Sequence, residues 1–298
     1  MARPLRYYRD MTFDYGIGEK VSPLVRRVIA RNPSPFTFHG TGTYIVGRGS
    51  VAVIDPGPLD AEHLRALQRA LEGETVSHIL ITHTHRDHSP AAAPLKEATG
   101  APTFAFGPHG TPPGGPGVEE GGDHLFDPDE RLPDGAVVEG RGWTLEAIHT
   151  PGHTSNHMCF GLREEKTLFT GDHVMGWSTT VVSPPDGDMT DYMASLKRLL
   201  DRDDQALIPT HGPPITDPQA HVAALLDHRV EREDQILAVL AAGIGHIPEM
   251  VAHIYADVPV GLHKAAGRSV HAHLVKLARE GRVAAEPSFG ADALYRLP

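Results

Sequence analysis

The chain has 298 residues, of which 40% are hydrophobic and 22% are charged. These proportions are typical of a folded globular protein and exclude a disordered chain. Lys and Arg number 27 against 38 Asp and Glu, a formal net charge of −11, so no global positive field attracts nucleic acid, although a local patch or a metal centre can still hold phosphate. The single cysteine, Cys159, excludes an internal disulfide and lies in an apolar run, where we expect it to be buried in a protein of a reducing compartment.

The ends and the apolar runs predict where the protein resides. The first residues are basic and aromatic but lack the apolar core of a signal peptide. The longest apolar stretch, 236–245, is far shorter than the ~20 residues that a membrane span needs. We therefore expect a cytoplasmic protein without a membrane-spanning segment.

Short strand-like runs alternate with helical patterns from about residue 41 to residue 211. A hairpin is indicated at 43–54 by two β-type runs around Gly-Arg-Gly-Ser, and a helix at 61–71 by leucines on one face. The near-continuous apolar run 77–82 is typical of a strand buried on both faces. Further strands are predicted at 103–106, 143–148, 157–162 and 167–170. Strands alternating with helices predict an α/β layered domain.

Two later segments differ from this pattern. Residues 107–122 are rich in Gly and Pro, which indicates either a surface insertion or a flap beside a site. After residue 212 the pattern becomes helical, at 217–242, 247–255 and 267–280, followed by two short runs at 281–285 and 293–297. Three helices and a small β-ribbon fit a winged-helix module. We predict a catalytic domain over 1–212 and a winged-helix-like domain over 213–298.

Four separated segments carry metal-ligand residue types, each in a turn that follows a strand-like run. Chain ends of this kind converge on one edge of a sheet, and such loops commonly hold catalytic ligands. Imidazole and carboxylate groups bind Zn²⁺ at ~2.0–2.2 Å, and two metals about 3.5–4 Å apart can activate a water molecule. The candidate ligands are His83, His85, Asp87 and His88, then His153, Asp172 and His211.

The HxHxDH motif and the three later segments resemble the metallo-β-lactamase superfamily over about residues 40–212. The resemblance implies an αββα sandwich with a dinuclear zinc site at its edge. It assigns one zinc to His83, His85 and His153, the second to Asp87, His88 and His211, and the bridge to Asp172. The implied nucleophile is a hydroxide between the metals, which makes Asp87 and Asp172 the residues on which catalysis depends. Histidine and aspartate sites also accept Fe or Mn.

A closer resemblance, over most of the chain, is to the lactamase-β-like protein 2 group. It rests on the Gly40–Tyr44 pattern, which departs from the group at Gly42, the Asp55-Pro56-Gly57 turn, and the runs 175–189 and 191–196. That group carries a C-terminal winged helix and includes a single-strand endoribonuclease. A carboxylate at Asp172 disfavours penicillin hydrolysis, because antibiotic-hydrolysing members generally lack one there.

These features predict a dinuclear-zinc endoribonuclease acting on single-stranded RNA. The alternatives are a thioester hydrolase of the glyoxalase II type, a hydrolase of a lactone or another small anionic ester, and a winged-helix binding protein with a vestigial site. Two Zn²⁺, two aspartates and a hydroxide leave about one positive charge, which suits a phosphodiester and a polarised thioester alike.

Several further side chains have two interpretations. Tyr192 and Ser195 can line the cleft or pack, His173 can support the site or pack, and His157 and Trp177 are expected to pack. On helix 267–280, Val270, Leu274 and Leu277 are predicted to face the core. Arg268, Lys276 and Arg279 are predicted on the outer face, following a phosphate backbone or simply solvated. The module can also brace the catalytic domain or form a homodimer contact.

Overall fold

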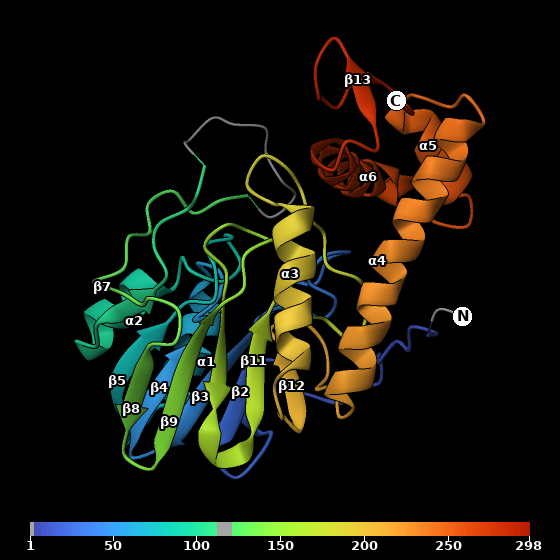
Figure 1. Ribbon diagram of the computed structural model, residues 1–298. Coiled ribbons are helices and arrows are strands. Elements are labelled where there is room, and N and C mark those ends of the chain that lie inside the picture. Colours follow the sequence, from blue (N-terminus) through green and yellow to red (C-terminus); the bar gives the residue numbers. More distant parts are fainter. Residues whose placement is uncertain (1–2, 112–120) are drawn as a thin grey trace.

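The computed structural model describes residues 3–111 and 121–298 and shows two β-sheets packed face to face between layers of helices (Figure 1). Within these residues the first sheet has seven strands in the order β1 to β7, and the second has five in the order β12, β11, β10, β9, β8. The first sheet comprises β1 (Glu19–Lys20), β2 (Val25–Ile29), β3 (Gly42–Arg48), β4 (Ser50–Ile54), β5 (Thr75–Leu80), β6 (Thr103–Ala105) and β7 (Glu130–Arg131). The second comprises β8 (Val137–Gly140), β9 (Trp143–His149), β10 (Met158–Leu162), β11 (Thr167–Gly171) and β12 (Ala206–Pro209).

The two faces of each sheet contribute to different cores because side chains alternate along a strand. On β3, Tyr44 and Val46 pack between the sheets, whereas Ile45 packs against the helices outside the first sheet. Trp143 and Phe160 of the second sheet complete the central core, and both are buried. Burial on both faces explains why the β3 sequence is almost continuously apolar.

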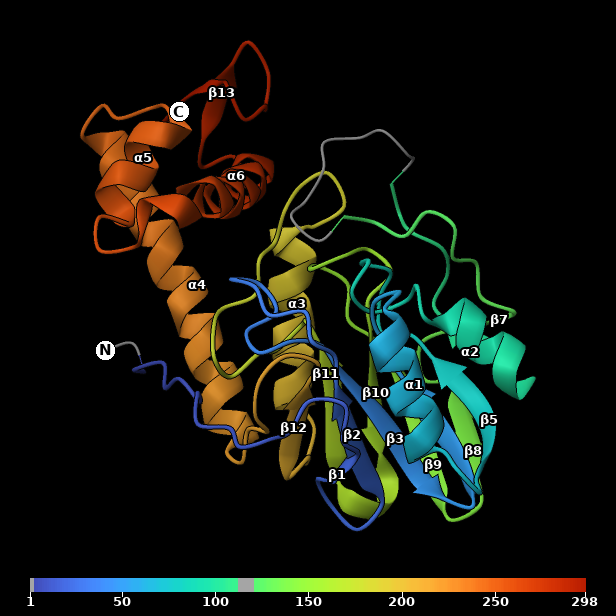
Figure 2. The same cartoon turned by 180° about the vertical axis from the view of Figure 1, so that it is seen from behind.

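Helices cover the outer face of each sheet. On the first sheet lie α1 (Ala61–Ala70) and α2 (Ala92–Thr99), seen from behind in Figure 2, and on the second lies α3 (Met189–Leu200). Two helices begin at an aspartate that accepts backbone N–H groups of the first turn: Asp60 for α1 and Asp188 for α3. The resulting αββα sandwich confirms the predicted fold class.

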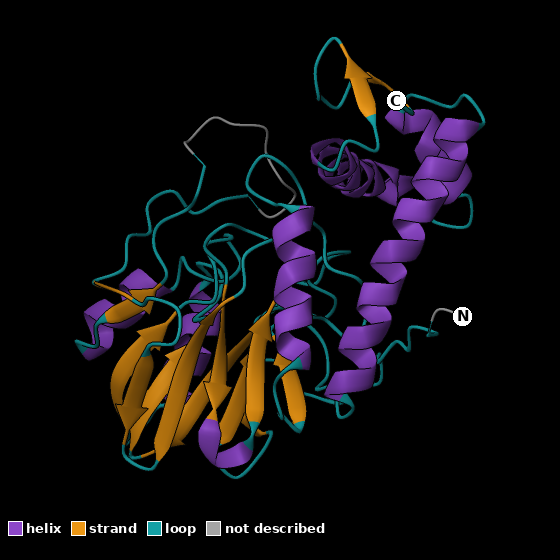
Figure 3. Cartoon of the chain, in the orientation of Figure 1, coloured by secondary structure: helices purple, strands orange, loops and turns teal. Residues whose placement is uncertain are grey.

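A long helix joins the sandwich to a helical C-terminal module (Figure 3). Val222 and Leu225 of this helix, α4 (Pro218–Ala241), pack in the core under α3, while Ile236 and Leu240 pack in the core of the module. The module contains α5 (Ile247–Ile254), the 3₁₀ turn η2 (Val260–Leu262), α6 (His263–Arg279), β13 (Ala284–Glu286) and β14 (Leu294–Arg296). Since α4 contributes to both cores, the domain boundary after residue 212 stays a prediction.

Most of the predicted elements are present, with differences that have physical reasons. Strand β2 was not predicted because two arginines interrupt its apolar pattern, yet Arg27 is buried and pairs with Glu19 of β1. Helix α6 begins at His263 rather than at 267. Gly267 does not mark the start of the helix but lies inside it, where its small size lets Ile247 and Val251 of α5 pack closely. Helix α2 was also missed, and residues 112–120 of the Gly/Pro-rich segment lie outside the described residues.

Of the predictions about single residues, some agree with the structure and one does not. Val270, Leu274 and Leu277 are buried in the core of the module, as expected. Cys159 is also buried, which raises the pKa of its thiol to about 12. The expectation that Lys276 lies on an outer face is wrong, because its ammonium group is buried against Glu233 of α4. Across the described part of the chain, none of the helices combines the length and the apolar character that crossing a bilayer requires.

Candidate active site

The seven predicted metal ligands lie together where strands of both sheets end. His83, His85, Asp87 and His88 are in the loop after β5, His153 in the loop after β9, Asp172 directly after β11, and His211 after β12. The two sheets therefore supply ligands to the same edge of the sandwich. All seven residues are buried.

Three histidines form the first group. Nδ1 of His85 lies 3.0 Å from Nε2 of His83 and 3.1 Å from Nε2 of His153. Ring nitrogens that converge from two loops at these distances can hold one metal ion, and the three residues form one of the clusters able to do so. His153 is oriented by its other nitrogen, Nδ1, which lies 2.7 Å from the carbonyl oxygen of Val181.

Asp87, His88 and His211 form the second group. Oδ2 of Asp87 lies 3.3 Å from Nε2 of His88 and 3.1 Å from Nε2 of His211, and it accepts a hydrogen bond of 3.2 Å from the hydroxyl of Thr41. The other ring nitrogen of His211, Nδ1, lies 3.2 Å from the carbonyl oxygen of Gly40. This group can also hold a metal ion.

Asp172 lies between the two groups. One carboxylate oxygen, Oδ2, is 3.8 Å from Nε2 of His153 and 3.6 Å from Nε2 of His88, while the other, Oδ1, is 3.4 Å from Nε2 of His211. Oδ2 thus faces both groups and Oδ1 the second, so the carboxylate is placed to serve as a ligand of either ion, and with His83 and His88 it forms a further group able to hold a metal.

A buried aspartate that the sequence reasoning did not assign supports the site from behind. Because Ile54 pairs with Leu80 in the parallel β4–β5 ladder, Asp55 lies level with the start of the ligand loop. Its carboxylate accepts hydrogen bonds from the backbone and the hydroxyl of Thr82 and from the hydroxyl of Thr210, and lies 2.9 Å from Nδ1 of His88. A partner of this kind fixes the ring orientation of a metal-binding histidine. A polar residue directly after a buried strand was the available signal.

The two groups differ in their acid–base properties. Burial and the neighbouring histidines hold the pKa values of His83 and His85 well below the usual range, so both rings are neutral. Burial also opposes a charge on His211, yet Asp172 and Asp87 raise its pKa to about 10. Asp87, Asp172 and Asp55 likewise raise the pKa of His88 well above its usual value. The second group therefore favours positive charge, and a metal ion competes with protons for its nitrogens.

The donor set fits metal ions. Buried polar atoms in proteins are usually hydrogen-bonded, but four atoms at the centre of the cluster have no hydrogen-bond partner among the described residues. They are Oδ1 of Asp87, Nε2 of His88, Oδ1 of Asp172 and Nε2 of His211. With Asp55, three buried carboxylates surround the cluster, and two divalent cations together with one hydroxide would balance their charge.

The three residues predicted to contact substrate lie beneath the site. Tyr192 is fully buried and donates a hydrogen bond of 3.0 Å to the carbonyl of His173, whose own ring is buried against it. Ser195 donates to the carbonyl of Pro151, two residues before His153. These contacts are those of positioning residues, and substrate contact by the three stays a prediction. His157 is packed as expected, and its Nε2 accepts the backbone N–H of Asp172.

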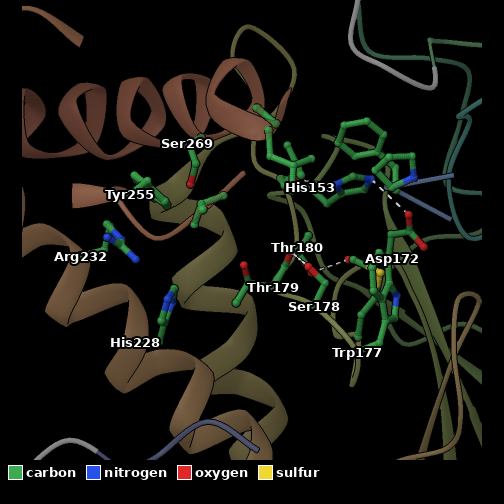
Figure 4. A pocket seen from close by; sticks show the side chains of 18 of the residues that line it. His153, Asp172, Trp177, Ser178, Thr179, Thr180, His228, Arg232, Tyr255 and Ser269 are labelled. Carbon is green, nitrogen blue, oxygen red and sulfur yellow. Dashed lines mark hydrogen bonds and ion pairs between the residues drawn. The ribbon is translucent and has the colours of Figure 1, made fainter. Parts of the chain in front are cut away.

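A cavity of about 280 Å³ opens beside the cluster and extends to the C-terminal module. Figure 4 shows His153 and Asp172 on one side of it and Arg232 and Tyr255 on the other. Its wall is largely apolar, with contributions from Met175, Val181, Tyr255, Val258, Leu262 and Ala266. No sequence pattern indicated this cavity, because its wall combines several loops of the sandwich with α4 and with segments of the module.

Residues 37–211 match the family model of the metallo-beta-lactamase superfamily, and residues 247–291 match the beta-lactamase associated winged helix domain. The chain belongs to the metallo-beta-lactamase superfamily. It is a hydrolase of this superfamily with a C-terminal winged-helix domain, as the sequence predicted.

Similar proteins cover almost the whole chain. A beta-lactamase-like protein 2 homolog of Caenorhabditis elegans is 33% identical over 89% of this chain and 88% of its own length. An atrochrysone carboxyl ACP thioesterase of Aspergillus chevalieri is 34% identical over 93% of this chain and 88% of its own. Among solved structures, a metallo-beta-lactamase family protein of Thermus thermophilus is 25% identical, with a TM-score of 0.75 over 94% of this chain and 100% of that one.

Proposed function

We propose that the protein is a metal-dependent thioester hydrolase whose substrate places its acyl group in the cavity beside the metal ligands. The observation that carries this proposal is the largely apolar wall that begins at His153 and Asp172 and continues onto the module. An apolar acyl chain gains about 0.8 kcal/mol for each CH₂ group that it buries. The similarity to a protein named as an acyl carrier protein thioesterase supports the same reaction class.

The predicted ligands divide the work of holding the metals. We assign His83, His85 and His153 to one zinc ion and Asp87, His88 and His211 to the second, and we assign Asp172, whose oxygens lie near His153, His88 and His211, to both. Two zinc ions bound there would polarise the scissile carbonyl and acidify water. Asp55 and the carbonyl of Val181 hold His88 and His153 in orientation, so the donor atoms are positioned before substrate arrives.

The winged-helix domain supplies substrate contacts in this proposal. Its residues Tyr255, Val258 and Leu262 form the part of the cavity wall opposite the metal ligands. A bound acyl group is therefore enclosed by both domains and shielded from water, as is usual for pockets that hold small molecules.

Cleavage of single-stranded RNA is the second candidate, supported by the sequence resemblance and by Trp177, which lines the cavity as an aromatic surface on which a base can stack. The cations of α6 and β14 give it little support. In the module Lys276 pairs with Glu233 and Glu280, Arg279 with Asp188 of α3, and Arg296 with Glu286. These cations are therefore already balanced by carboxylates, so they do not form an unpaired basic track for phosphates.

One experiment compares the two candidates. The zinc-loaded protein is assayed on N-acetylcysteamine thioesters with acetyl, butyryl and hexanoyl groups and, in parallel, on an end-labelled unstructured RNA. We expect kcat/KM to rise with acyl length and the RNA to remain intact. Asp172→Ala should lose more activity than the ~10–100-fold typical of losing an outer-shell partner, together with bound zinc measured by mass spectrometry.

Asp203→Ala is the matched control, because Asp203 is an exposed aspartate that pairs with Lys166 at the start of β11 and β12, the opposite end of these strands from Asp172 and His211. It should keep full activity and both metals. If the wild type cleaves the RNA internally, Asp172→Ala does not, and neither hydrolyses the thioesters, the protein is an endoribonuclease and the thioesterase proposal is wrong. Full thioesterase activity after both metals are removed contradicts either mechanism.

A further inference from the structure

Two arginines of α4 line the cavity without a carboxylate partner among the described residues. Arg229 and Arg232 make no ion pair with any carboxylate in residues 3–111 and 121–298, although Arg229 is only 2% exposed. Among the described residues that line the cavity, Asp172 is the one with a carboxylate, and it is a candidate metal ligand. An arginine buried without a counter-charge is costly, so a compensating anion is expected nearby.

The hydrogen bonds of the two guanidinium groups leave donors unused. Nη2 of Arg229 donates to the carbonyl of Thr180 at 2.6 Å, and the group lies 5.0 Å from the ring centroid of Tyr192. Nη1 of Arg232 donates to Gln235 and to the carbonyl of Ile254. In the described part of the chain Nε of each arginine has no hydrogen-bond partner. The groups are thus held in position by carbonyls and aromatic rings, and among the described residues Nη1 of Arg229 and Nη2 of Arg232 make no hydrogen bond, which leaves them for a further acceptor.

Two glutamates flank Arg232 in the sequence: Glu231 is exposed and makes no ion pair with either arginine in the described part of the chain, and Glu233 is already paired with other cations. Glu233 is adjacent to Arg232 in α4, but it lies 3.0 Å from Nζ of Lys276 and 3.7 Å from Nη1 of Arg282. The positive charge beside the cavity is therefore not balanced, and its effect is visible at His228. Burial, Arg229 and Arg232 lower the pKa of that histidine to about 3, so it is neutral at pH 7.

The arginines lie close to the metal ligands. The carbonyl of Thr180 accepts the hydrogen bond of Arg229, and the carbonyl of the next residue, Val181, contacts Nδ1 of His153. Arg229 and His153 are therefore held by carbonyls of neighbouring residues, and both side chains line the same cavity. Figure 4 shows Arg232 and His228 projecting from α4 on the side of the cavity opposite Asp172.

We propose that the substrate's acyl group carries a carboxylate that pairs with Arg229 and Arg232 while the scissile carbonyl lies at the metal ligands. This inference rests on the proposed thioesterase function and specifies its substrate class. A planar guanidinium binds a carboxylate through two parallel hydrogen bonds, which also fixes the position of the acyl chain. The apolar wall between the arginines and the ligands then contacts the methylene or aromatic part of the same group.

The test compares two thioesters that differ only in the terminal carboxylate: glutaryl- and pentanoyl-N-acetylcysteamine, whose thiol carries no charge. We expect the wild type to hydrolyse the glutaryl compound with the higher kcat/KM. Arg232→Met should lower that value roughly 10- to 100-fold, mainly through KM, and lower the pentanoyl value by much less. Arg229→Lys, which keeps a charge but not the fork, should lower it less.

Arg296→Met is the matched control, because Arg296 is exposed on β14, pairs with Glu286 and does not line the cavity. It should change neither substrate. Equal wild-type rates on the two thioesters, or an equal loss on both in Arg232→Met, would overturn the proposal.

A binding measurement separates this inference from the proposed function. Metal-free protein is titrated calorimetrically with monomethyl glutarate and with methyl pentanoate. The expected result is tighter binding of the carboxylate compound to the wild type and loss of this difference in Arg232→Met. If no thioester is hydrolysed, the proposed function fails, while this preference still establishes the anion site. Monomethyl glutarate that binds no better than methyl pentanoate, or does not bind, contradicts the anion site itself.

Discussion

Two clusters of buried charged side chains among the described residues differ in how their charge is balanced, and this difference separates a functional cluster from a structural one. Between α4 and α6, Lys276 lies 3.0 Å from Glu233 and 2.7 Å from Glu280, so the buried cation is matched by carboxylates of the chain itself. At the sheet edge, histidines and aspartates converge with atoms that have no hydrogen-bond partner among the described residues. Buried charge that the protein does not balance is where a ligand or metal binds.

The largest effect is expected where the sheet-edge cluster is held from behind. Asp55→Asn keeps the size of the side chain but removes the negative charge beside Nδ1 of His88. It also replaces one carboxylate oxygen by an NH₂ group, which cannot accept the hydrogen bonds that the hydroxyls of Thr82 and Thr210 donate. We expect kcat/KM to fall about 10- to 100-fold, with weaker retention of metal against a chelator. Steady-state kinetics and metal analysis of the same preparation measure both. An Asn variant with unchanged metal retention and rate would show that Asp55 only packs.

The next effect is a pH dependence of stability that arises in the cluster of Lys276, Glu233 and Glu280 between α4 and α6. Burial lowers the pKa of His273 to about 4, although its contact with Glu233 opposes this. In the unfolded chain the pKa of a histidine is about 6.5, so between pH 6.5 and pH 4 the unfolded chain binds more protons than the folded protein. The contribution of His273 to the free energy of unfolding is therefore fully present above pH 6.5 and is lost as the pH falls toward 4. From pH 6.5 to pH 5 the loss amounts to about 2 kcal/mol.

His273→Gln removes this contribution, so its free energy of unfolding should fall less between pH 7.5 and pH 5 than that of the wild type. Urea unfolding at the two pH values measures the difference. The other buried histidines are common to both proteins and cancel in the comparison. An identical pH dependence in the two proteins would mean that His273 has an ordinary pKa.

A smaller effect is expected at the apolar part of the cavity wall, on the side of the module. Leu262 lines the cavity from η2, on the side of the module. Leu262→Ala should lower kcat/KM for hexanoyl thioesters about 10-fold, equivalent to about 1.4 kcal/mol of lost contact, and leave acetyl thioesters unchanged. The ratio of the two rates in one preparation is the measurement, which is insensitive to the amount of folded protein. Equal losses on both substrates would place the acyl group elsewhere.

The contrast between the two clusters also determines what could be predicted. The ligands were visible in the sequence because each stands in a short motif directly after a strand, and parallel strands bring such ends together. The pairing of Lys276 with Glu233 was not visible, since helical spacing shows which residues share a face but not which helix packs against it. The cavity was missed for the same reason, because Val181 and Tyr255 meet only through the packing of α4 to α6 on the sandwich.

The smallest effect is expected at the ion pair between the module and the sandwich. Arg279 of α6 pairs with Asp188, the residue that caps α3, but the arginine side chain is 60% exposed. Water and salt screen such a pair, so Arg279→Gln should lower the free energy of unfolding by less than about 1 kcal/mol. Asp188→Ala removes the helix cap as well and should cost about 1 kcal/mol more. Urea unfolding of both variants at about 0.05 M and about 0.5 M salt separates the two contributions, because only the ion pair weakens with salt. A larger loss in Arg279→Gln than in Asp188→Ala would mean that the docking of the module, and not the cap, depends on this contact.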